Sequence, residues 1–182
     1  VSWDPVLLSA VSDLEVESEE EDGFLWHIRY TPADGSASLV VATTRPETIP
    51  ADTAVAVNPK DPRYAHLIGK HVYRALPLDV PKEQRIIPII ADEHVDFEFG
   101  TGVLKVTPAH DKADFEIGQR HKLPIVDIMN VNGTMNELAG ESLAGLDRFE
   151  ARDVAVERLK ELKVLVEEKP YENNVGFSQR AD

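Results

Sequence analysis

Hydroxyl, cationic and carboxylate side chains gather around a proline in residues 42–48, ATTRPET. Pro46 restricts the residue before it to extended backbone, so a stiff loop presents these side chains. Such a loop could bind a polar ligand, or it could be a strand-end loop rich in hydrogen-bonding residues. The polar side chains of the segment are those of Thr43, Thr44, Arg45, Glu47 and Thr48.

A second polar group lies in residues 99–118, FGTGVLKVTPAHDKADFEIG. Lys105 and Thr107 are two positions apart on an expected strand, so they face the same side of it. Asp111 and Asp114 fall in the first turn of the helix that follows, where Asp111 suits the N-cap and the helix dipole favours Asp114. These structural roles do not explain why a lysine, a threonine and two carboxylates converge on one corner. Such a corner could hold an amine against Asp114 and a hydroxyl against Thr107 or Asp111.

A metal site is the third possibility, because His110, Asp111, Asp114 and His121 are ligand types for zinc or manganese. Adjacent His110 and Asp111 tend to point apart, and we expect His121 at the helix C-terminus, so no metal site is predicted. The chain has no cysteine, which excludes thiolate ligands and cysteine nucleophiles. It also lacks the G-x-S-x-G and G-x-x-x-x-G-K-[ST] motifs of serine hydrolases and NTPases.

The charge of the chain is strongly acidic, with 33 Asp and Glu against 19 Lys and Arg and a net charge of −14. Residues 1–22 contain eight acidic residues and no Lys or Arg, which indicates a solvated strand margin or, alternatively, an acidic interaction tail. This balance argues against a protein that coats nucleic acid by bulk charge. A few well-placed cations could still contact one nucleic-acid end.

The length of 182 residues and the 42% content of hydrophobic residues predict one soluble globular domain with a real core. No segment approaches the roughly 20 apolar residues of a membrane span, and no signal peptide opens the chain. The absence of cysteine fits a cytoplasmic protein.

Short β-like runs separated by turn residues dominate the chain after Gly23. Pro88 inside one run favours an edge position or a bulge, and the pair Asn132-Gly133 favours a tight turn. The predicted strands are residues 24–31, 38–44, 53–58, 85–90, 102–107 and 125–130.

Two helices are predicted between these strands. The first is capped by Asp111 and ends near His121, before a proline. The second begins at Asp147, and its apolar stripe is predicted to be core: Phe149, Val156, Leu159 and Leu162. The fold class is therefore predicted as mainly β with helices (α+β).

Several long blocks of the chain resemble the editing domain that is inserted into valyl-, isoleucyl- and leucyl-tRNA synthetases. TTRPET is followed about 50 residues later by FGTGVLKVTPAHDKADFEIG. The blocks DTAVAVNPKDPRYAHLIGK, IPIIADEHVDFEFGTG and GLDRFEAR resemble the valyl branch in particular. The likeness covers nearly the whole chain. Two departures are Ile49-Pro50-Ala51 after RPET, where the family often has Met-Gly, and Asn58 where His is frequent.

The resemblance implies a β-barrel-like editing domain over residues 1–182, with 1–22 and 171–182 as connecting segments to an absent catalytic domain. We therefore expect the chain ends to lie near one another. The parent enzyme would ligate valine to tRNA(Val) with ATP. No H-I-G-H or K-M-S-K-S signature is present, so ATP and Mg are expected only in that catalytic domain, and no cofactor in this one.

The implied activity is hydrolysis of the ester in mischarged threonyl-tRNA(Val), because a pocket shaped for valine cannot strongly reject threonine. We expect Asp114 to bind the α-ammonium, with Arg45 and Thr48 orienting the ester and the terminal adenosine. We expect Lys105, Thr107 and Asp111 to recognise the threonine hydroxyl and Phe99 to form a wall of the pocket. Thr43 and Thr44 are expected to help orient the ester and the adenosine.

Three alternatives to this function stay open at the level of sequence. The first is an isoleucyl- or leucyl-type editing domain with the same chemistry. The second is a non-catalytic module that binds a tRNA end through Arg45, Lys105 and Lys112. The third is a metal-dependent hydrolase.

Overall fold

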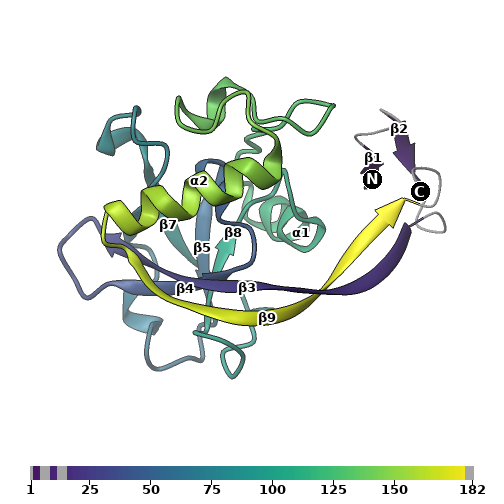
Figure 1. Cartoon of the computed structure of the whole chain (residues 1–182). Helices are drawn as coiled ribbons and strands as arrows, with labels where there is room; N and C mark the ends of the chain where they lie inside the picture. The colour runs from purple at the N-terminus through teal and green to yellow at the C-terminus, as the bar shows by residue number, and fades with distance from the viewer. Residues whose placement is uncertain (1, 5–8, 12–15, 179–182) are drawn as a thin grey trace.

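The fold is a mostly β, barrel-shaped sheet that is nearly closed, with α-helices packed on it (Figure 1). The computed structural model describes residues 2–4, 9–11 and 16–178, and the side chains of residues 23–171. The sheet begins with β4 (Leu39–Thr43), β3 (Val16–Pro32) and β6 (His71–Tyr73), and continues with β7 (Ile86–Ala91), β5 (Ala54–Val57) and β8 (Val103–Val106). The end strands β4 and β8 contact each other, which curls the sheet into a barrel. The predicted fold class is confirmed.

Strand β3 and the last strand, β9 (Leu165–Ser178), form a long antiparallel ribbon that extends beyond the barrel (Figure 1). Their register runs from Val16 opposite Ser178 to Ile28 opposite Leu165. The strand predicted at residues 24–31 therefore starts earlier, and the acidic residues from 17 to 22 belong to it. Residues 1 and 182 lie outside the described residues, but the ribbon brings Val16 and Ser178 together. Two short strands, β1 (Ser2–Asp4) and β2 (Ser9–Val11), pair separately.

Strands β4, β5, β7 and β8 confirm four predicted runs. All four residues of β5 are buried because the strand is covered on both faces. Val55 and Val57 pack into the main core of the barrel, while Ala54 and Ala56 pack against Val106 and Ile117. This second, smaller core fixes α1 (Lys112–His121) beside β8.

Pro88 does not lie in an edge strand of the sheet, so the edge alternative of that expectation is wrong. Strand β7 runs between β6 and β5. Residues 86–88 pair with β6, whereas residues 89–91 pair with β5. Pro88 thus stands where the strand changes partner, which lets an interior strand accommodate a residue without an N–H donor.

The strand predicted at residues 125–130 is absent. Only a single bridge, Met129 to Met135, closes the tight turn that Asn132-Gly133 predicted, and Gly133 has φ +85°. Ile128 is buried, and its N–H donates to His110 Nε2 at 3.1 Å. Ile128, with Val126 and Met129 packed against the same core, therefore anchors a loop to the barrel, and the segment does not extend the sheet.

Both predicted α-helices are confirmed, with Asp111 and Asp147 as their N-caps. The apolar stripe predicted for α2 (Arg148–Glu161) is only half correct: Val156 and Leu159 are buried, but Phe149 is 53% and Leu162 is 39% exposed. The buried face of α2 contains small residues, Ala151 and Ala155, that allow close packing. The short 3-10 helices are η2 (Pro46–Ala51), η3 (Ala65–Leu67), η4 (Lys82–Gln84) and η5 (Glu137–Ala139).

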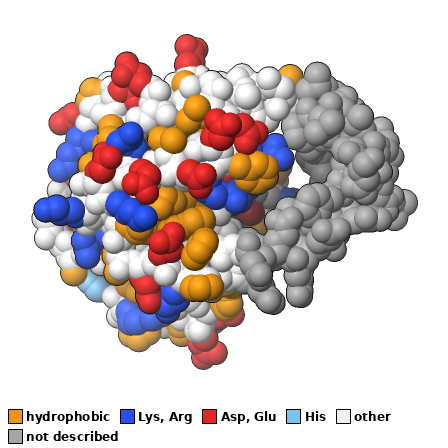
Figure 2. Space-filling model, in the orientation of Figure 1, with side chains coloured by type: hydrophobic (Ala, Val, Ile, Leu, Met, Phe, Trp, Pro, Cys, Tyr) orange, Lys and Arg blue, Asp and Glu red, His pale blue; other side chains and the backbone are white. Residues whose placement is uncertain are grey.

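Charged side chains of both signs are interspersed on the face shown in Figure 2, with hydrophobic side chains exposed between them. No continuous basic surface is visible on this face. Among the described helices, none has the length and apolar character needed to cross a membrane.

Candidate functional site

A pocket of about 660 Å³ opens between the end of β4, η2, β8 and the start of α1. The strand-end loop and the strand-to-helix corner that the sequence singled out form two of its sides. The structure brings all nine predicted site residues to its lining: Thr43, Thr44, Arg45, Thr48, Phe99, Lys105, Thr107, Asp111 and Asp114.

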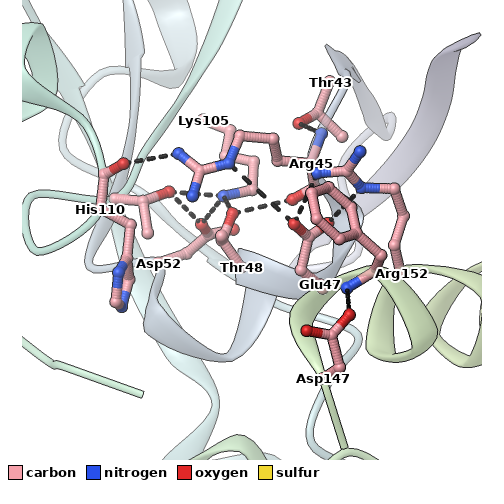
Figure 3. A network of polar contacts seen from close by, with 11 residues as sticks. Thr43, Arg45, Glu47, Thr48, Asp52, Lys105, His110, Asp147 and Arg152 are labelled. Carbon is pink, nitrogen blue, oxygen red and sulfur yellow. Dashed lines mark hydrogen bonds and ion pairs between the residues drawn. The ribbon is translucent and has the colours of Figure 1, made fainter. Parts of the chain in front are cut away.

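Lys105 forms a buried cluster at the base of the pocket (Figure 3). Its Nζ donates to Thr48 Oγ1 at 2.8 Å and to Thr107 Oγ1, and it pairs with Asp52 Oδ1 at 2.5 Å. Three acceptors match the three N–H groups of a lysine ammonium. Lys105 is thus held in one position by the residues around it.

Asp52, which the sequence reasoning missed, is the centre of this cluster. The residue is fully buried and its carboxylate accepts from the hydroxyl of Thr107 at 2.9 Å and from that of Tyr30. Burial raises the pKa of the Asp52 carboxyl, while the Lys105 ammonium and the hydroxyl donors act to lower it. A carboxylate in the apolar run IPADTAVAV was the signal that could have identified it.

Asp114 presents a partly free carboxylate to the pocket. Its Oδ2 accepts from the Thr107 N–H at 2.9 Å, and its own N–H donates to Asp111 Oδ1 at 3.0 Å. Its Oδ1 has no hydrogen-bond partner among the described residues. Burial raises the pKa of Asp114 to about 6, and the Asp111 carboxylate adds to the increase. An ionised Asp114 in this position is suited to receive a cationic group.

The backbone and side chain of Arg45 form hydrogen bonds with three other residues that line the pocket, Thr43, Thr48 and His110 (Figure 3). Its guanidinium donates to the His110 carbonyl at 2.6 Å and its side chain remains 38% exposed. Its carbonyl accepts from the Thr48 hydroxyl at 2.8 Å, and its N–H donates to Thr43 Oγ1 at 3.0 Å. Phe99, 69% exposed, stands at the rim.

Pro50, the departure that follows RPET, stands inside η2, and the helix continues through it. The N–H of Asp52 donates to the Ile49 carbonyl at 3.0 Å and closes the helix. The local sequence therefore delivers Thr48 and Asp52 to the same buried cluster, because they occupy the body and the C-cap of one short helix.

The four candidate metal ligands do not converge. His110 Nε2 accepts from the Ile128 N–H, and burial lowers the pKa of His110 to about 4, so its ring is neutral at pH 7. His121 ends α1, as expected, where its Nε2 lies 2.9 Å from Asp92 Oδ2. Within the described residues no group of three His, Cys, Asp or Glu side chains could hold a metal ion.

The three cations proposed for a tRNA-end binding module differ in how accessible they are to a ligand. Lys105 is 7% exposed and fully engaged, so its ammonium is not available to a backbone phosphate. Lys112 is exposed at the start of α1, and Arg45 is partly exposed. The pocket is thus lined by more carboxylate and hydroxyl groups than free cations.

Comparison with known proteins points to one family. Residues 70–148 match the family described as "Leucyl-tRNA synthetase, editing domain". A valine–tRNA ligase of Streptococcus pyogenes serotype M6 is 54% identical over 181 residues, which is 100% of this chain and 20% of that protein. The corresponding ligase of Parasynechococcus marenigrum is 56% identical over 180 residues, 99% of this chain and 19% of that protein. The ligase of Dechloromonas aromatica is 58% identical over 165 residues, 91% of this chain and 17% of that protein.

The fold also matches a solved structure, the LeuRS chain of a LeuRS–tRNA–LeuAMS ternary complex from Agrobacterium radiobacter K84. The TM-score is 0.59 at 18% identity, over 88% of this chain and 21% of that one. The chain thus spans about a fifth of the length of the relatives it matches. By its sequence, the chain belongs to the aminoacyl-tRNA synthetase editing domains, of the type found in valine–tRNA ligases.

Proposed function

We propose that this domain hydrolyses the ester of mischarged threonyl-tRNA(Val) for a parent enzyme that ligates valine to tRNA(Val). The observation that carries the proposal is the convergence of nine polar and aromatic side chains, from two distant segments, on one pocket of about 660 Å³. Such a site supplies partners for both the ammonium and the hydroxyl of a threonyl ester.

The need for such a site follows from the chemistry of the two amino acids. Threonine replaces one methyl group of valine by a hydroxyl, and an apolar pocket of the right size cannot strongly reject it. A second site with hydrogen-bonding groups can accept the hydroxyl. Valine would leave those buried groups unsatisfied, at a cost of about 1–3 kcal/mol for each.

Asp114 is assigned to the α-ammonium of the aminoacyl group. Its Oδ1 is free of described partners, while the Thr107 N–H holds Oδ2 and fixes the plane of the carboxylate. An ammonium beside this carboxylate favours its ionised form. Asp114 would thus fix the end of the substrate that is common to all amino acids.

The other side chains around Asp114 divide between the amino-acid side chain and the nucleotide. Thr107 and Asp111 accept the hydrogen of the threonine hydroxyl, and Lys105, whose N–H groups are all bonded within the buried cluster, holds Thr107 in place. Arg45 and Thr48 orient the ester and the terminal adenosine, supported by Thr43 and Thr44, and Phe99 closes one wall.

In this proposal a water oxygen bonds to the ester carbonyl carbon and the C–O bond to the terminal ribose breaks, so that threonine leaves and the ribose oxygen takes up a proton from the water. Positioned donors such as the partly exposed Arg45 guanidinium stabilise the developing negative charge. No metal or other cofactor takes part. His110 is not assigned as a general base because its ring already accepts the Ile128 N–H. The assigned residues of this chain bind and orient the substrate.

The expected partners are the 3′-end of aminoacylated tRNA(Val) and the catalytic domain of the parent synthetase, in the cytoplasm. ATP and Mg belong to that catalytic domain. The acidic charge of this chain, −14, predicts weak binding of tRNA by the chain alone, since phosphate contacts provide most of the affinity for nucleic acid.

The test is hydrolysis of threonyl-tRNA(Val) by the chain and by its Asp114→Ala variant. We expect the variant to lose most of the activity, while Asp153→Ala, which removes an exposed carboxylate of α2, keeps it. Full activity of Asp114→Ala would overturn the assignment of the ammonium site. Binding of the charged end without hydrolysis would favour the tRNA-end binding module.

A second substrate series identifies the branch of the family. The chain is compared on mischarged tRNA(Val), tRNA(Ile) and tRNA(Leu). The fastest hydrolysis is expected with threonyl-tRNA(Val). Preference for a mischarged tRNA(Ile) or tRNA(Leu) would support the isoleucyl- or leucyl-type alternative.

A further inference from the structure

The hydrogen bonds at the base of the pocket can run in only one direction. A lysine ammonium can only donate, and carboxylate and carbonyl oxygens can only accept. Thr107 lies between Lys105 and Asp52, so its oxygen accepts from the ammonium and its hydrogen points to the carboxylate. Thr48 lies between Lys105 and the Arg45 carbonyl, so the same logic applies to it.

The direction of these bonds determines what the two threonines can offer a ligand. A hydroxyl oxygen has one hydrogen and two acceptor sites. In Thr48 and Thr107 the hydrogen and one acceptor site are in use, which leaves one acceptor site on each oxygen. Lys105 has no N–H left for a ligand, because all three are bonded within the cluster.

The carboxylates beside them are also acceptors. Asp114 keeps Oδ1, and Asp111 uses only Oδ1 for the Asp114 N–H. We call the four side chains Thr48, Thr107, Asp111 and Asp114 the acceptor wall. A ligand group that meets this wall must donate a hydrogen, as an ammonium or a hydroxyl does.

We propose that Asp52 is a positioning residue that sets this direction and thereby makes the pocket recognise a ligand hydroxyl as a donor only. The ligand class, a β-hydroxy aminoacyl group, rests on the function proposed above. Asp52 does not line the pocket; it acts through Thr107 and Lys105.

The surroundings of Asp52 keep its carboxylate in place. The hydroxyl of Tyr30, a fully buried residue, donates to Oδ2, and Oδ1 receives both Lys105 and Thr107. The Arg74 guanidinium donates to the Asp52 carbonyl at 2.9 Å and holds the backbone. The carboxylate is therefore the fixed acceptor at the end of the chain of hydrogen bonds.

An asparagine at position 52 would change the direction. Its amide can turn an N–H toward Thr107, which then needs no acceptor there and can turn its own hydrogen toward the pocket. Lys105 would also lose its ionic partner. Asp52→Asn is thus expected to weaken the binding of ligands that donate a hydrogen bond and to allow the binding of ligands that can only accept one.

The experiment measures binding of three non-hydrolysable amides of 3′-amino-3′-deoxyadenosine to the whole chain. The acyl groups are threonyl, O-methylthreonyl, whose ether oxygen can only accept, and valyl. The native chain should bind the threonyl amide about tenfold more tightly than the other two. In Asp52→Asn the ratio of threonyl to O-methylthreonyl affinity should fall by about fivefold or more.

Asp92→Asn is the matched control, since Asp92 is also a buried aspartate that pairs with a cation, the Arg120 guanidinium at 2.9 Å, and neither residue lines the pocket. It should leave the affinity ratio unchanged, even if it lowers the unfolding temperature. Tyr30→Phe is the second variant, because it keeps Asp52 and removes one of its donors. It should lower the ratio by about twofold, so the test stands if Asp52→Asn does not fold.

The outcomes separate this inference from the proposed function. No binding of the threonyl amide by the native chain would count against the proposed function itself. Selective binding by the native chain, with the same ratio in Asp52→Asn and Tyr30→Phe, would overturn only the role of Asp52. Equal binding of the threonyl and O-methylthreonyl amides by the native chain would overturn the acceptor wall.

Discussion

The Glu47 carboxylate accepts two parallel hydrogen bonds from the Arg152 guanidinium, from Nε at 3.0 Å and from Nη2 at 2.9 Å (Figure 3). Glu47 is fully buried. The pair joins η2 to α2, and η2 carries Thr48 into the pocket. A helix on the outside of the barrel thus helps to fix a wall of the site without contacting a ligand.

Removing the arginine of this pair should destabilise the domain strongly. Arg152→Ala leaves the buried Glu47 carboxylate without its two hydrogen bonds, with the Arg45 Nε at 4.0 Å as its remaining ion-pair partner, and we expect a loss of about 3 kcal/mol in the free energy of unfolding. Arg158→Ala on the same helix removes an exposed ion pair with Glu161 and should cost less than about 0.5 kcal/mol. Urea unfolding of both variants measures the difference; equal losses would show that the Glu47–Arg152 pair adds no special stability.

The rate of hydrolysis should depend on the ionisation of Asp114. Since its pKa is raised to about 6, the carboxylate is increasingly protonated below that pH and no longer pairs with an ammonium. We expect kcat/KM for threonyl-tRNA(Val) to fall on the acid side with an apparent pKa near that value. A pH series of single-turnover rates checks it, and an acid limb that persists unchanged in Asp114→Asn would assign the titration to another group.

The folding stability of the domain should also depend on the ionisation of Asp114, but here low pH, which protonates the carboxyl, is the favourable condition. A carboxyl whose pKa is higher in the folded state than in the unfolded chain stabilises the fold at low pH, and this contribution is lost as the pH rises through about 6. Asp114→Asn cannot ionise, so at pH 8 it should be more stable than the native chain by about 2 kcal/mol. The advantage should disappear at pH 3. Thermal or urea unfolding at both pH values tests the sign.

Two glycines before β8, in the loop that carries Phe99, allow a matched comparison of alanine substitutions. Both have positive φ, +59° at Gly100 and +77° at Gly102. A Cβ at Gly100 would meet open space, whereas a Cβ at Gly102 would lie 2.5 Å from Arg63 Nη2 and displace it from Asp61. Gly100→Ala should cost about 1 kcal/mol of folding free energy and Gly102→Ala about 2 kcal/mol.

The same two variants also test how the loop acts on binding. Arg63 donates to the Phe97 carbonyl at 2.8 Å, so its displacement should move the loop. Gly102→Ala is expected to weaken binding of the threonyl amide more than Gly100→Ala does. Similar affinities for the two variants would show that the Arg63 contact does not position this wall.

Exhaustive chelation should leave the hydrolysis of threonyl-tRNA(Val) intact. The proposed roles use ammonium, hydroxyl and carboxylate groups, and His110 and His121 are bonded to different partners. The rate after treatment with a chelator and removal of the chelator by dialysis is the measurement. Loss of activity that returns with zinc or manganese would support the metal-dependent hydrolase.

The strand-to-helix corner could be predicted from sequence because its residues are close together along the chain. Asp111, Asp114 and Thr107 lie within eight positions, and a cap, a helix dipole and a strand face determine their directions. Asp52 could not be placed in the same way. Its partners Tyr30 and Lys105 come from other strands, and only the closure of the barrel brings them together.

The failures in the fold have a similar origin. An apolar run at residues 125–130 met the criteria for a strand, but among the described residues its β pairing is limited to the bridge from Met129 to Met135. In α2 the periodicity identified the helix correctly, yet Phe149 lies outside the core, beside the guanidinium groups of Arg148 and Arg152. Periodicity alone does not tell which of two adjacent faces the barrel will cover.

The ribbon of β3 and β9 has a consequence for the time course of folding. Trp26 and Glu168, which are 142 positions apart, are joined across it by a hydrogen bond of 2.8 Å. Pairings at such separation close late, because the entropy of the intervening loop must be lost first. During synthesis β3 therefore stays without its β9 partner until the end of the chain has been made. A chain that stops before β9 would leave that edge of β3 unpaired and prone to aggregation.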